Sequence, residues 1–320
     1  DKTILESKDR VRSAIQNSNL TFPLQKVTIN LAPANLIKTG STLDLPIAIA
    51  ILAASRQLTG LDITNKFFVG ELSLGGNIRP VHGIINIVES AKNAGFTEVF
   101  IPYENLNSAA IVGDIKIYPV KGLQQVFLHL KNQTSIIPIN SSTYQSSIVA
   151  HPQQFNVTID HIHGLNFAKR ALVLALAGHH NILFSGPPGS GKTLLAKAIP
   201  SLLPPPTPKE LLEITKLNEL SSTLNSTNIR PFRSPHHSSS TCSIIGGGTP
   251  IIPGEISLAH HGVLFLDELP EFSHQVLEAL RQPLEDRQIT IARTKQKVTY
   301  PANFILVATM NPCPCGFYGS

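Results

Sequence analysis

The sequence predicts an α/β protein of two units, of which the second is built around a glycine-rich loop. Segments with helical periodicity alternate with segments of strand periodicity along most of the chain. An apolar strand at 182–184 leads into Gly186-Pro-Pro-Gly-Ser-Gly-Lys-Thr193, and a helix follows. A second apolar strand, Gly262 to Leu266, ends in the acidic pair Asp267 and Glu268. These observations predict a three-layer α/β/α core in the second half.

Length and composition limit the class of protein. A chain of 320 residues predicts two domains, which we place at 1–131 and 156–320 with a linker at 132–155. Hydrophobic residues make up 42% of the chain and charged residues 15%, which excludes a largely disordered protein. The net charge of +5 and the pI of about 9.1 favour a polyanionic partner.

Cysteine usage and hydropathy indicate the compartment. The three cysteines, Cys242, Cys313 and Cys315, do not form a disulfide framework, and this predicts a reducing, cytoplasmic location. The sequence has no apolar run of about 18 residues and opens with no signal peptide, so we expect no membrane partner.

The elements of the first unit follow from periodicity and from turn residues. Helices are expected at 4–18, 44–58 (with Pro46 in its first turn), 84–94 (closed by Gly95), 106–111 and 123–130. Strands are expected at 26–31, 67–74, 98–102 and 115–118, and residues 78–81 begin a return after a turn at 75–77. The following stretch, 132–156, is rich in Ser, Gln, Thr, Asn and Pro and predicts a linker.

Three stretches of the first unit resemble the ribosomal-S5/Lon-protease type of fold. They begin Lys38-Thr-Gly-Ser-Thr, Gly70-Glu-Leu-Ser-Leu and Ala94-Gly-Phe-Thr-Glu. A Lon-like peptidase needs a serine nucleophile and a lysine base. The resemblance puts Ser41 or Thr42 at the nucleophile position but Ile85 at the base, so we expect a non-catalytic scaffold or interaction domain. The first strands of this fold are missing before Asp1, which predicts a clipped fragment.

The glycine-rich loop predicts a nucleoside triphosphate site. Glycines let successive backbone N–H groups point at a phosphate, and the helix N-terminus adds its positive dipole end. Lys192 is expected to reach the β- and γ-phosphates, and the Thr193 hydroxyl to ligate Mg²⁺. The predicted cofactors are therefore ATP and Mg²⁺, with binding residues Gly186, Pro187, Pro188, Gly189, Ser190, Gly191, Lys192, Thr193 and Leu194.

The acidic pair after the second apolar strand indicates a Walker B motif. Asp267 is expected to hold the Mg²⁺ shell, and Glu268 to polarise the attacking water. The alternative is a simple strand-end cap. The strand at 304–310 ends at Asn311, which is placed to sense the γ-phosphate or to hold the water. We therefore expect Lys192, Glu268 and Asn311 to be catalytic.

The remaining elements of the second unit carry weaker signals. Helices are expected at 168–177, 194–202, 210–217 and 273–284. Two alternating strands near 288–293 and 298–302 predict a β-hairpin whose basic tip (Arg293, Lys295 and Lys297) suits a phosphate backbone, the alternative being a solvated turn.

Two histidines and two cysteines of the second half are candidate metal ligands. His236 and His237 are adjacent on an extended chain and are expected to point apart, so no metal site is predicted there. Cys313 and Cys315 supply two thiolates of the four ligands that a structural zinc site needs, so free thiols are expected within this chain.

Together these segments are similar to the YifB/ComM family of magnesium-chelatase-like AAA+ proteins. The most specific carriers are Arg230-Pro-Phe-Arg-Ser-Pro-His-His, the run from Pro253 to Phe272, and Asn311-Pro-Cys-Pro-Cys-Gly. The resemblance implies a P-loop AAA+ core, a ring-forming, hexameric ATPase, and a base pocket at Ile162, His163 and Gly164, with a surface or packing histidine as the alternative for His163. It also implies that segments 230–262 and 288–301 face the ring pore, and that the C-terminal lid, the arginine finger and the second sensor lie beyond Ser320.

The resemblance leaves three functional hypotheses open. ComM proteins are regarded as DNA helicases that migrate branches during natural transformation, which predicts an ATP-driven motor on DNA. Chelatase subunits of the wider group predict an ATPase that remodels a protein partner. The third hypothesis is an assembly module that binds nucleotide without turnover. One departure is Leu165, whose position usually carries Gln in the family.

Overall fold

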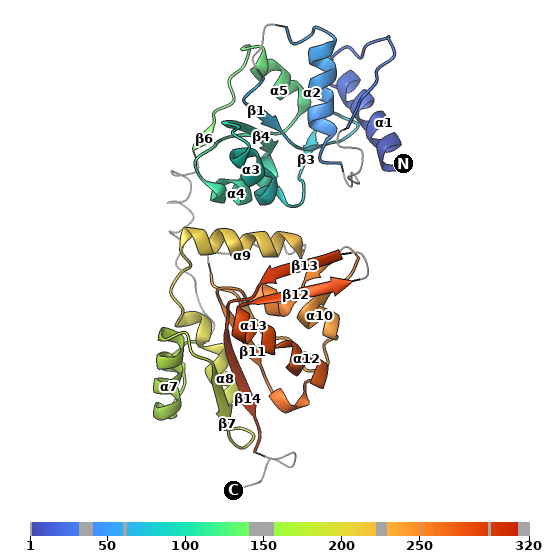
Figure 1. Ribbon diagram of the computed structural model, residues 1–320. Helices are drawn as coiled ribbons and strands as arrows, with labels where there is room; N and C mark the ends of the chain where they lie inside the picture. The colour runs from blue at the N-terminus through green and yellow to red at the C-terminus, as the bar shows by residue number, and fades with distance from the viewer. Residues whose placement is uncertain are drawn as a thin grey trace. The chain divides into compact units, whose positions relative to one another are not determined.

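The computed structural model describes residues 2–31, 41–59, 63–140, 157–221, 229–249, 251–293 and 296–312. The chain divides into two compact units, Asp1–Ala150 and His151–Ser320 (Figure 1). Each unit combines a mainly parallel sheet with helices, so the mixed α/β fold class is confirmed.

The first unit is built on a four-stranded sheet in the order β1-β4-β5-β6. Its strands are β1 (Lys66–Phe68), β4 (Glu98–Pro102), β5 (Lys116–Val120) and β6 (Ile139–Asn140). The first three are parallel and β6 is antiparallel to β5. A separate antiparallel ribbon joins β2 (Glu71–Leu72) to β3 (Ile78–Arg79).

The helices of the first unit bury both faces of this sheet. Side chains from α1 (Lys2–Asn17), α2 (Asp44–Ala54) and α5 (Leu123–Leu130) pack with Phe100 and Tyr118 in one core. Successive strand residues point to opposite faces, and Val99 and Ile101, on either side of Phe100, are also fully buried. The remaining helical segments are α3 (Ile84–Asn93), η1 (Tyr103–Asn105), α4 (Leu106–Ala109) and η2 (Ala110–Val112).

Three expectations for the first unit were wrong. Residues 26–31 form no strand, because no described segment pairs with them and Val27 and Ile29 stay exposed. The strand expected at 67–74 is two strands in different sheets, because the Gly70 backbone bonds to Thr42 and Leu45 instead of continuing the ladder. The start of the predicted linker contains β6, which belongs to the first sheet.

The second unit contains a four-stranded parallel sheet in the order β7-β14-β11-β8. Its strands are β7 (Ile182–Ser185), β14 (Ile305–Met310), β11 (Val263–Leu266) and β8 (Phe232–Arg233). Two antiparallel pairs lie outside it, β9 (Gly246–Gly247) with β10 (Ile252–Pro253) and β12 (Gln288–Arg293) with β13 (Gln296–Pro301). The predicted hairpin is therefore present.

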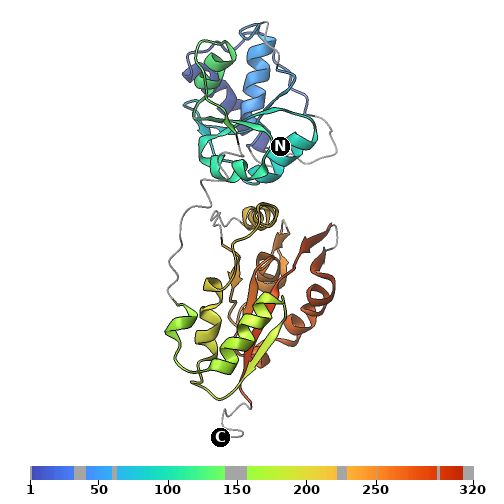
Figure 2. The same ribbon diagram turned by 90° about the vertical axis from the view of Figure 1, so that its left-hand side faces the viewer.

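The central strand β11 separates two cores, which makes the second unit a three-layer α/β/α structure. Val263 and Phe265 pack with α7 (Asn166–Ala177) and α8 (Lys192–Lys197). Leu264 and Leu266 pack with α10 (Thr241–Ile245), α11 (Glu255–Leu258) and α12 (His274–Ala279). Figures 1 and 2 show α7 and α8 on one side of the sheet and α12 and α13 (Arg281–Asp286) on the other. The remaining helical segments are η3 (Ile159–His161), η4 (Ile199–Ser201), α9 (Pro208–Leu220) and η5 (Leu269–Glu271).

Prolines interrupt two helices that were expected to be continuous. The helix predicted at 273–284 breaks between α12 and α13, because Pro283 has no N–H for the Ala279 carbonyl, where α12 ends. The helix predicted at 194–202 stops at Lys197 and continues as η4, which contains Pro200. Both breaks lie one turn before the proline ring.

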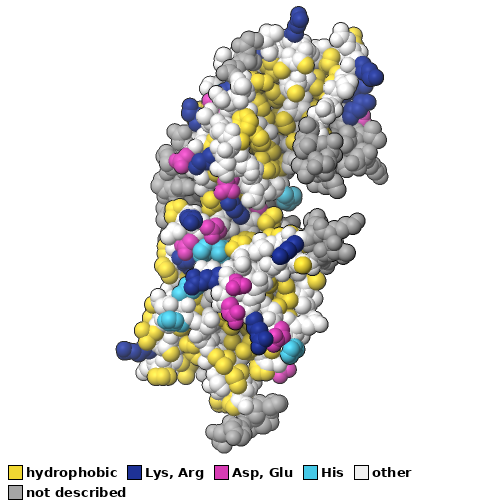
Figure 3. All heavy atoms as spheres, viewed as in Figure 1, with side chains coloured by type: hydrophobic (Ala, Val, Ile, Leu, Met, Phe, Trp, Pro, Cys, Tyr) yellow, Lys and Arg dark blue, Asp and Glu magenta, His cyan; other side chains and the backbone are white. Residues whose placement is uncertain are grey.

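Charges on the face seen in Figure 3 are interspersed, with basic and acidic side chains near one another. On that face the net positive charge is therefore not gathered into one block. None of the helices in the described ranges combines the length and the apolar character needed to cross a bilayer.

A buried ion pair in the first unit gives a stability prediction. The Asp44 carboxylate is 1% exposed and accepts hydrogen bonds from Ser7 and from Arg10 Nε, the latter at 2.8 Å. Asp44→Asn should destabilise the protein by about 3 kcal/mol, because the Arg10 guanidinium loses its buried partner. Asp114→Asn removes the exposed partner of Lys92 and should cost less than about 0.5 kcal/mol. Urea unfolding measures both, and equal costs would contradict the assignment.

Candidate functional site

The loop between β7 and α8 has the backbone that its glycines predict. Gly189 and Gly191 have φ angles of 77° and 86°, a region that other residues rarely adopt. Strand β7 lies beside β14, with Ser185 opposite Met310, and the Gly186 N–H donates to the Met310 carbonyl at 3.3 Å. The loop therefore opens at the carboxyl edge of the sheet, where polar residues after neighbouring strands also lie.

Lys192 lies across this loop. Its Nζ donates to the carbonyls of Gly186 (2.7 Å) and Pro187 (2.8 Å) and contacts Ser190 Oγ at 3.3 Å. Asn311 Oδ1, at the end of β14, is also 3.3 Å away. The structure thus brings together Lys192 and Asn311, which are 119 residues apart in the sequence.

The carboxylate of Asp267 joins two hydroxyl groups. Thr193 Oγ1, in the first turn of α8, donates to Asp267 Oδ2 at 3.0 Å. Thr309, 1% exposed on β14, donates its hydroxyl to Asp267 Oδ1 and accepts the Glu268 N–H at 3.0 Å. The sequence did not predict a role for Thr309, although it lies in the predicted strand 304–310, two residues before the sensor candidate Asn311. This arrangement of hard oxygen atoms suits Mg²⁺.

Glu268 is adjacent to Asp267 but differs from it in backbone conformation and in solvent exposure. Its φ angle is 55°, and its carboxylate is 53% exposed. A cavity of about 360 Å³ has both acids in its wall. The residues that line this cavity are Pro188, Gly189, Ser190, Gly191, Lys192, Thr193, Leu194, Asp267, Glu268, Thr309 and Asn311. Most of the predicted phosphate and metal residues therefore surround one space.

The predicted base pocket is not part of this cavity wall. Ile162 is 3% exposed and packs in the core with Leu172 and Leu195. His163 and Gly164 are exposed. The next residue, Leu165, is the one that approaches the loop, since its Cδ1 would lie 3.0 Å from a Cβ added to Gly191. Leu165 is therefore a close neighbour of the loop, and the base pocket at Ile162, His163 and Gly164 stays a prediction.

The remaining sequence candidates are distributed as follows. Lys297 is exposed on β13 and Arg293 ends β12, while Lys295 lies outside the described residues. Cys313 and Cys315 also lie outside them. In the first unit, Ser41 donates its hydroxyl to the Glu71 carboxylate, and Ile85 is fully buried.

The expectation that His236 and His237 point apart was wrong. Their ring centroids are 4.1 Å apart with an interplanar angle of 36°. The chain turns here, because the Ser239 N–H donates to the His236 carbonyl at 2.9 Å. The His237 Nδ1 atom lies 3.9 Å from Glu268 Oε2, so this segment reaches the candidate site.

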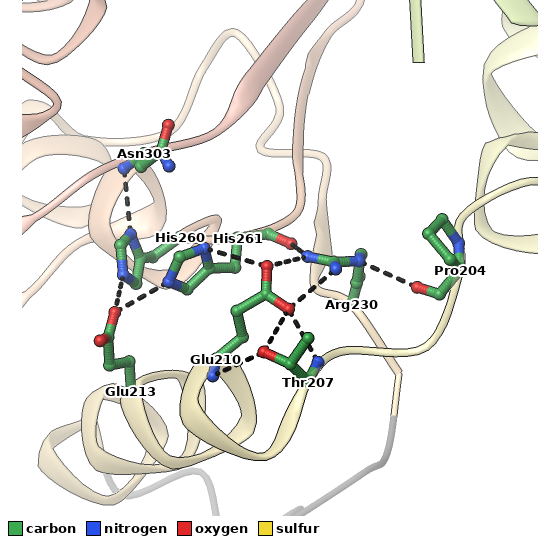
Figure 4. A network of polar contacts seen from close by, with 8 residues as sticks. All are labelled: Pro204, Thr207, Glu210, Glu213, Arg230, His260, His261 and Asn303. Carbon is green, nitrogen blue, oxygen red and sulfur yellow. Dashed lines mark hydrogen bonds and ion pairs between the residues drawn. The ribbon is translucent and has the colours of Figure 1, made fainter. Parts of the chain in front are cut away.

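A second polar network lies at the opposite, amino end of the sheet (Figure 4). Arg230 forms a bidentate pair with Glu210 at 2.9 and 3.0 Å and also donates to the carbonyls of Pro204 and His261. His260 Nε2 and His261 Nε2 lie 3.0 and 2.8 Å from Glu213 Oε2. The network ties α9 to the residues that precede β8 and β11. No local sequence pattern predicts this network, because its members lie far apart along the chain.

Glu213, His260 and His261 form a candidate metal site, because their ligand atoms lie within 4.8 Å of one another. A metal-bound histidine donates its other ring N–H to an acceptor. His260 Nδ1 instead accepts the Asn303 N–H at 3.0 Å, so its Nε2 carries the proton that points to Glu213. The hydrogen bonds of His260 therefore favour a structural clamp over a metal site.

Burial and hydrogen bonding shift the titration of this network. Burial lowers the pKa of His260, and the hydrogen bond to Glu213 opposes the shift only in part. Burial alone would raise the pKa of Glu213, but hydrogen bonds from His260 and His261 outweigh it and lower that pKa. Likewise, bonds from Arg230 and Thr207 overcome burial and lower the pKa of Glu210 to about 2.

Comparison with known proteins gives two matching family descriptions. "Magnesium chelatase, subunit ChlI" matches residues 158–320, and "Subunit ChlI of Mg-chelatase" matches residues 1–105.

Individual relatives extend this similarity over nearly the whole chain. The chain is 46% identical to the competence protein ComM of Haemophilus influenzae, over 99% of this chain and 63% of ComM. It is 44% identical to YifB of Escherichia coli, over 99% of this chain and 62% of YifB. The 67 kDa magnesium-chelatase subunit of Chlorobaculum parvum is 27% identical over 47% of this chain and 22% of that subunit. The chain thus spans less than two thirds of the length of ComM and YifB.

Thr309 gives a stability prediction at the candidate site. Thr309→Val should destabilise the protein by about 2 kcal/mol, because the Glu268 N–H loses its acceptor and Asp267 loses a donor. Thr309→Ser keeps the hydroxyl and should cost less than half as much. Urea unfolding checks this, and a valine variant as stable as the serine variant would contradict it.

Glu210 gives a pH prediction. Its pKa in the folded protein, about 2, is below the unfolded value of 4.5, so its stabilisation is complete above pH 4.5 and is lost as the pH falls towards 2. Glu210→Gln should lower the free energy of unfolding by about 2 kcal/mol at pH 7. The variant should also show a shallower decline of that free energy between pH 4.5 and 2. Unfolding free energies across that window measure the slope, and parallel curves would count against the assignment.

Proposed function

This chain belongs to the magnesium-chelatase-like AAA+ family that includes ComM and YifB, and on that premise we propose that it is an ATP-hydrolysing motor that acts on DNA. The observation that carries the proposal is the contact of Thr193 with Asp267 beside Lys192, in one cavity with Glu268 and Asn311. A phosphate-binding loop, a hydroxyl, a carboxylate suited to a metal and a solvent-exposed carboxylate are the parts that phosphoryl transfer to water requires.

Binding of the triphosphate is assigned to the loop and to Lys192. Backbone N–H groups of residues 189–193 lie at the start of α8, where the helix dipole favours negative charge. The Lys192 ammonium group would exchange its present carbonyl partners for phosphate oxygens. Thr193 Oγ1 and Asp267 would hold Mg²⁺, which when bound neutralises the charge of the β- and γ-phosphates.

Hydrolysis is assigned to Glu268. Its carboxylate is exposed in the cavity wall, while its backbone is fixed by Thr309, so it can accept a proton from water at that edge of the sheet. Asn311, within 3.3 Å of Lys192, is the group proposed to sense the γ-phosphate.

Action on DNA is proposed from the β12–β13 hairpin. Its tip joins Arg293 to Gln296, and Lys297 follows on the exposed side of β13. Lysine and arginine at a narrow tip suit contacts to a phosphate backbone. We propose that six copies of the chain form a ring that presents these hairpins to one strand. The name "competence protein" of the ComM relative agrees with a role in DNA processing.

A second candidate is favoured by the similarity to the 67 kDa magnesium-chelatase subunit. On this alternative the same ATPase cycle would remodel a protein partner, and DNA would have no effect on turnover. The two candidates share the nucleotide site and differ in the partner.

The nucleotide site is tested with two substitutions. Lys192→Ala should weaken ATP binding by at least about tenfold, because the triphosphate loses its ammonium partner. Glu268→Gln should leave binding within about twofold and slow hydrolysis by about 100-fold. Binding of a fluorescent ATP analogue and release of phosphate measure the two effects. Undiminished affinity in the Lys192 variant would refute the proposed site.

The DNA partner is tested at the hairpin. Forked DNA should raise the ATPase rate of the whole protein, and a variant with both Lys295→Ala and Lys297→Ala should lose most of that increase while keeping its basal rate. Lys209→Ala, at an exposed lysine of α9, is the matched control. If forked DNA does not change the ATPase rate of the unaltered protein, the result would favour the chelatase-like alternative.

A further inference from the structure

The two oxygen atoms of the Asp267 carboxylate have different neighbours. Oδ1 accepts a hydrogen bond from the hydroxyl of Thr309, which lies on the adjacent strand β14. Oδ2 accepts from Thr193 Oγ1 at 3.0 Å, in the first turn of α8. All three residues line the cavity of about 360 Å³. Oδ2 is therefore the carboxylate oxygen next to the phosphate-binding loop, and Oδ1 is the one next to β14.

The Thr309 hydroxyl has a single proton, and its neighbours determine where that proton points. Thr309 Oγ1 accepts the Glu268 N–H at 3.0 Å, and this contact uses a lone pair of the hydroxyl oxygen. A carboxylate can only accept hydrogen bonds, so the hydroxyl proton is directed at Asp267 Oδ1. Thr309 is 1% exposed, and its branched side chain has few alternative rotamers. A fixed, buried donor therefore occupies Oδ1.

This occupied oxygen limits how Asp267 can hold a cation. Mg²⁺ requires near-ideal octahedral geometry and keeps several waters, so a carboxylate that offers one oxygen suits it. Ca²⁺ takes about six to eight oxygen ligands and often binds both oxygens of one carboxylate. To bind a cation with both oxygens, Asp267 would have to give up its hydrogen bond from Thr309, and the buried hydroxyl would lose its acceptor.

Other oxygen atoms of the cavity wall are directed elsewhere. Glu268 leaves the strand at a φ angle of 55°, and its carboxylate is 53% exposed. Asn311 Oδ1 accepts from Lys192 Nζ at 3.3 Å. Among the described residues of this wall, Thr193 Oγ1 and Asp267 Oδ2 are thus the oxygen pair best placed for a cation. A shell with so few protein oxygens is completed by phosphate and water, which is typical of Mg²⁺.

We propose that Thr309 determines which divalent cation the nucleotide site accepts, because its hydroxyl restricts Asp267 to one oxygen and so favours Mg²⁺ over Ca²⁺. The inference rests on the proposed nucleotide site and adds its cation specificity. Thr309 is a positioning residue that acts through Asp267. Removal of its hydroxyl frees Oδ1, so the affinity for Ca²⁺ should rise relative to the affinity for Mg²⁺.

The first test measures metal affinity without turnover. The whole protein is mixed with a fluorescent ATP analogue in metal-free buffer, and analogue binding is titrated with Mg²⁺ and, separately, with Ca²⁺. In Thr309→Val, the ratio of half-saturating Ca²⁺ to half-saturating Mg²⁺ should fall by at least about fivefold. Thr309→Ser keeps the hydroxyl and should keep this ratio within about twofold. Because both metals are compared on the same variant, a lower folded fraction affects the two titrations equally.

Thr215→Val is the matched control for the loss of a buried hydroxyl. Thr215 is 3% exposed on α9, and its hydroxyl donates to the Leu211 carbonyl at 2.7 Å. It is not part of the cavity wall, so the Thr215 variant should keep the metal ratio of the unaltered protein. An unchanged ratio in Thr309→Val, or an equal fall in Thr215→Val, would overturn the proposal.

The second test observes the carboxylate directly. Crystals grown with Ca²⁺ and the ATP analogue should show one Asp267 oxygen within about 2.6 Å of the ion in the unaltered protein and two in Thr309→Val. Two oxygens on the ion in the unaltered protein would contradict the inference. If the unaltered protein binds the metal and the analogue but hydrolyses no ATP, the proposed motor fails, and the metal ratio still decides the role of Thr309. If neither metal promotes binding, the proposed nucleotide site and the inference both fail.

Discussion

The hydrogen bonds that join Thr193, Asp267 and Thr309 depend on how β11 is fixed in the sheet. Strand β11 lies between β14 and β8, and its side chains enter two cores, with Val263 on one face and Leu264 on the other. All four of its residues are buried. A strand held on both faces and along both edges has little freedom to shift, so its end presents Asp267 at a defined place. The hydroxyls of α8 and β14 then meet a carboxylate whose position is set by packing.

The same strands carry polar networks at both ends. At the amino end, Arg230 and the backbone of His261 connect the starts of β8 and β11 to α9, and Asn303 adds the start of β14. Groups this buried are stable only when their hydrogen bonds are satisfied, and the network supplies partners for the Arg230 guanidinium and for both ring nitrogens of His260. The network thus fixes the sheet at the amino ends of its strands. The candidate nucleotide site lies at the opposite, carboxyl ends.

The sequence predicted the features that depend on residues close together in the chain. It also predicted those that follow from the carboxyl ends of parallel strands meeting at one edge of a sheet. Each of three predicted site elements follows a strand of one parallel sheet: the glycine loop follows β7, Asn311 follows β14 and Asp267 follows β11. Their proximity could therefore be expected. Two kinds of feature could not. Strand formation at 26–31 requires a partner that periodicity does not specify. Contacts such as that between Glu213 and His260 join residues 47 positions apart, and only the completed topology reveals them.

Asp267 and Glu268 illustrate how backbone geometry divides the roles of two adjacent acids. Asp267 directly follows β11 and accepts two hydroxyl hydrogen bonds, which hold its carboxylate in place. At Glu268 the φ angle of 55° turns the chain away, and the carboxylate emerges half exposed. A stationary carboxylate suits a metal whose position must not change, whereas proton transfer from water requires a carboxylate that solvent can reach. In the proposed mechanism, the turn at Glu268 would therefore separate metal binding by Asp267 from water activation by Glu268.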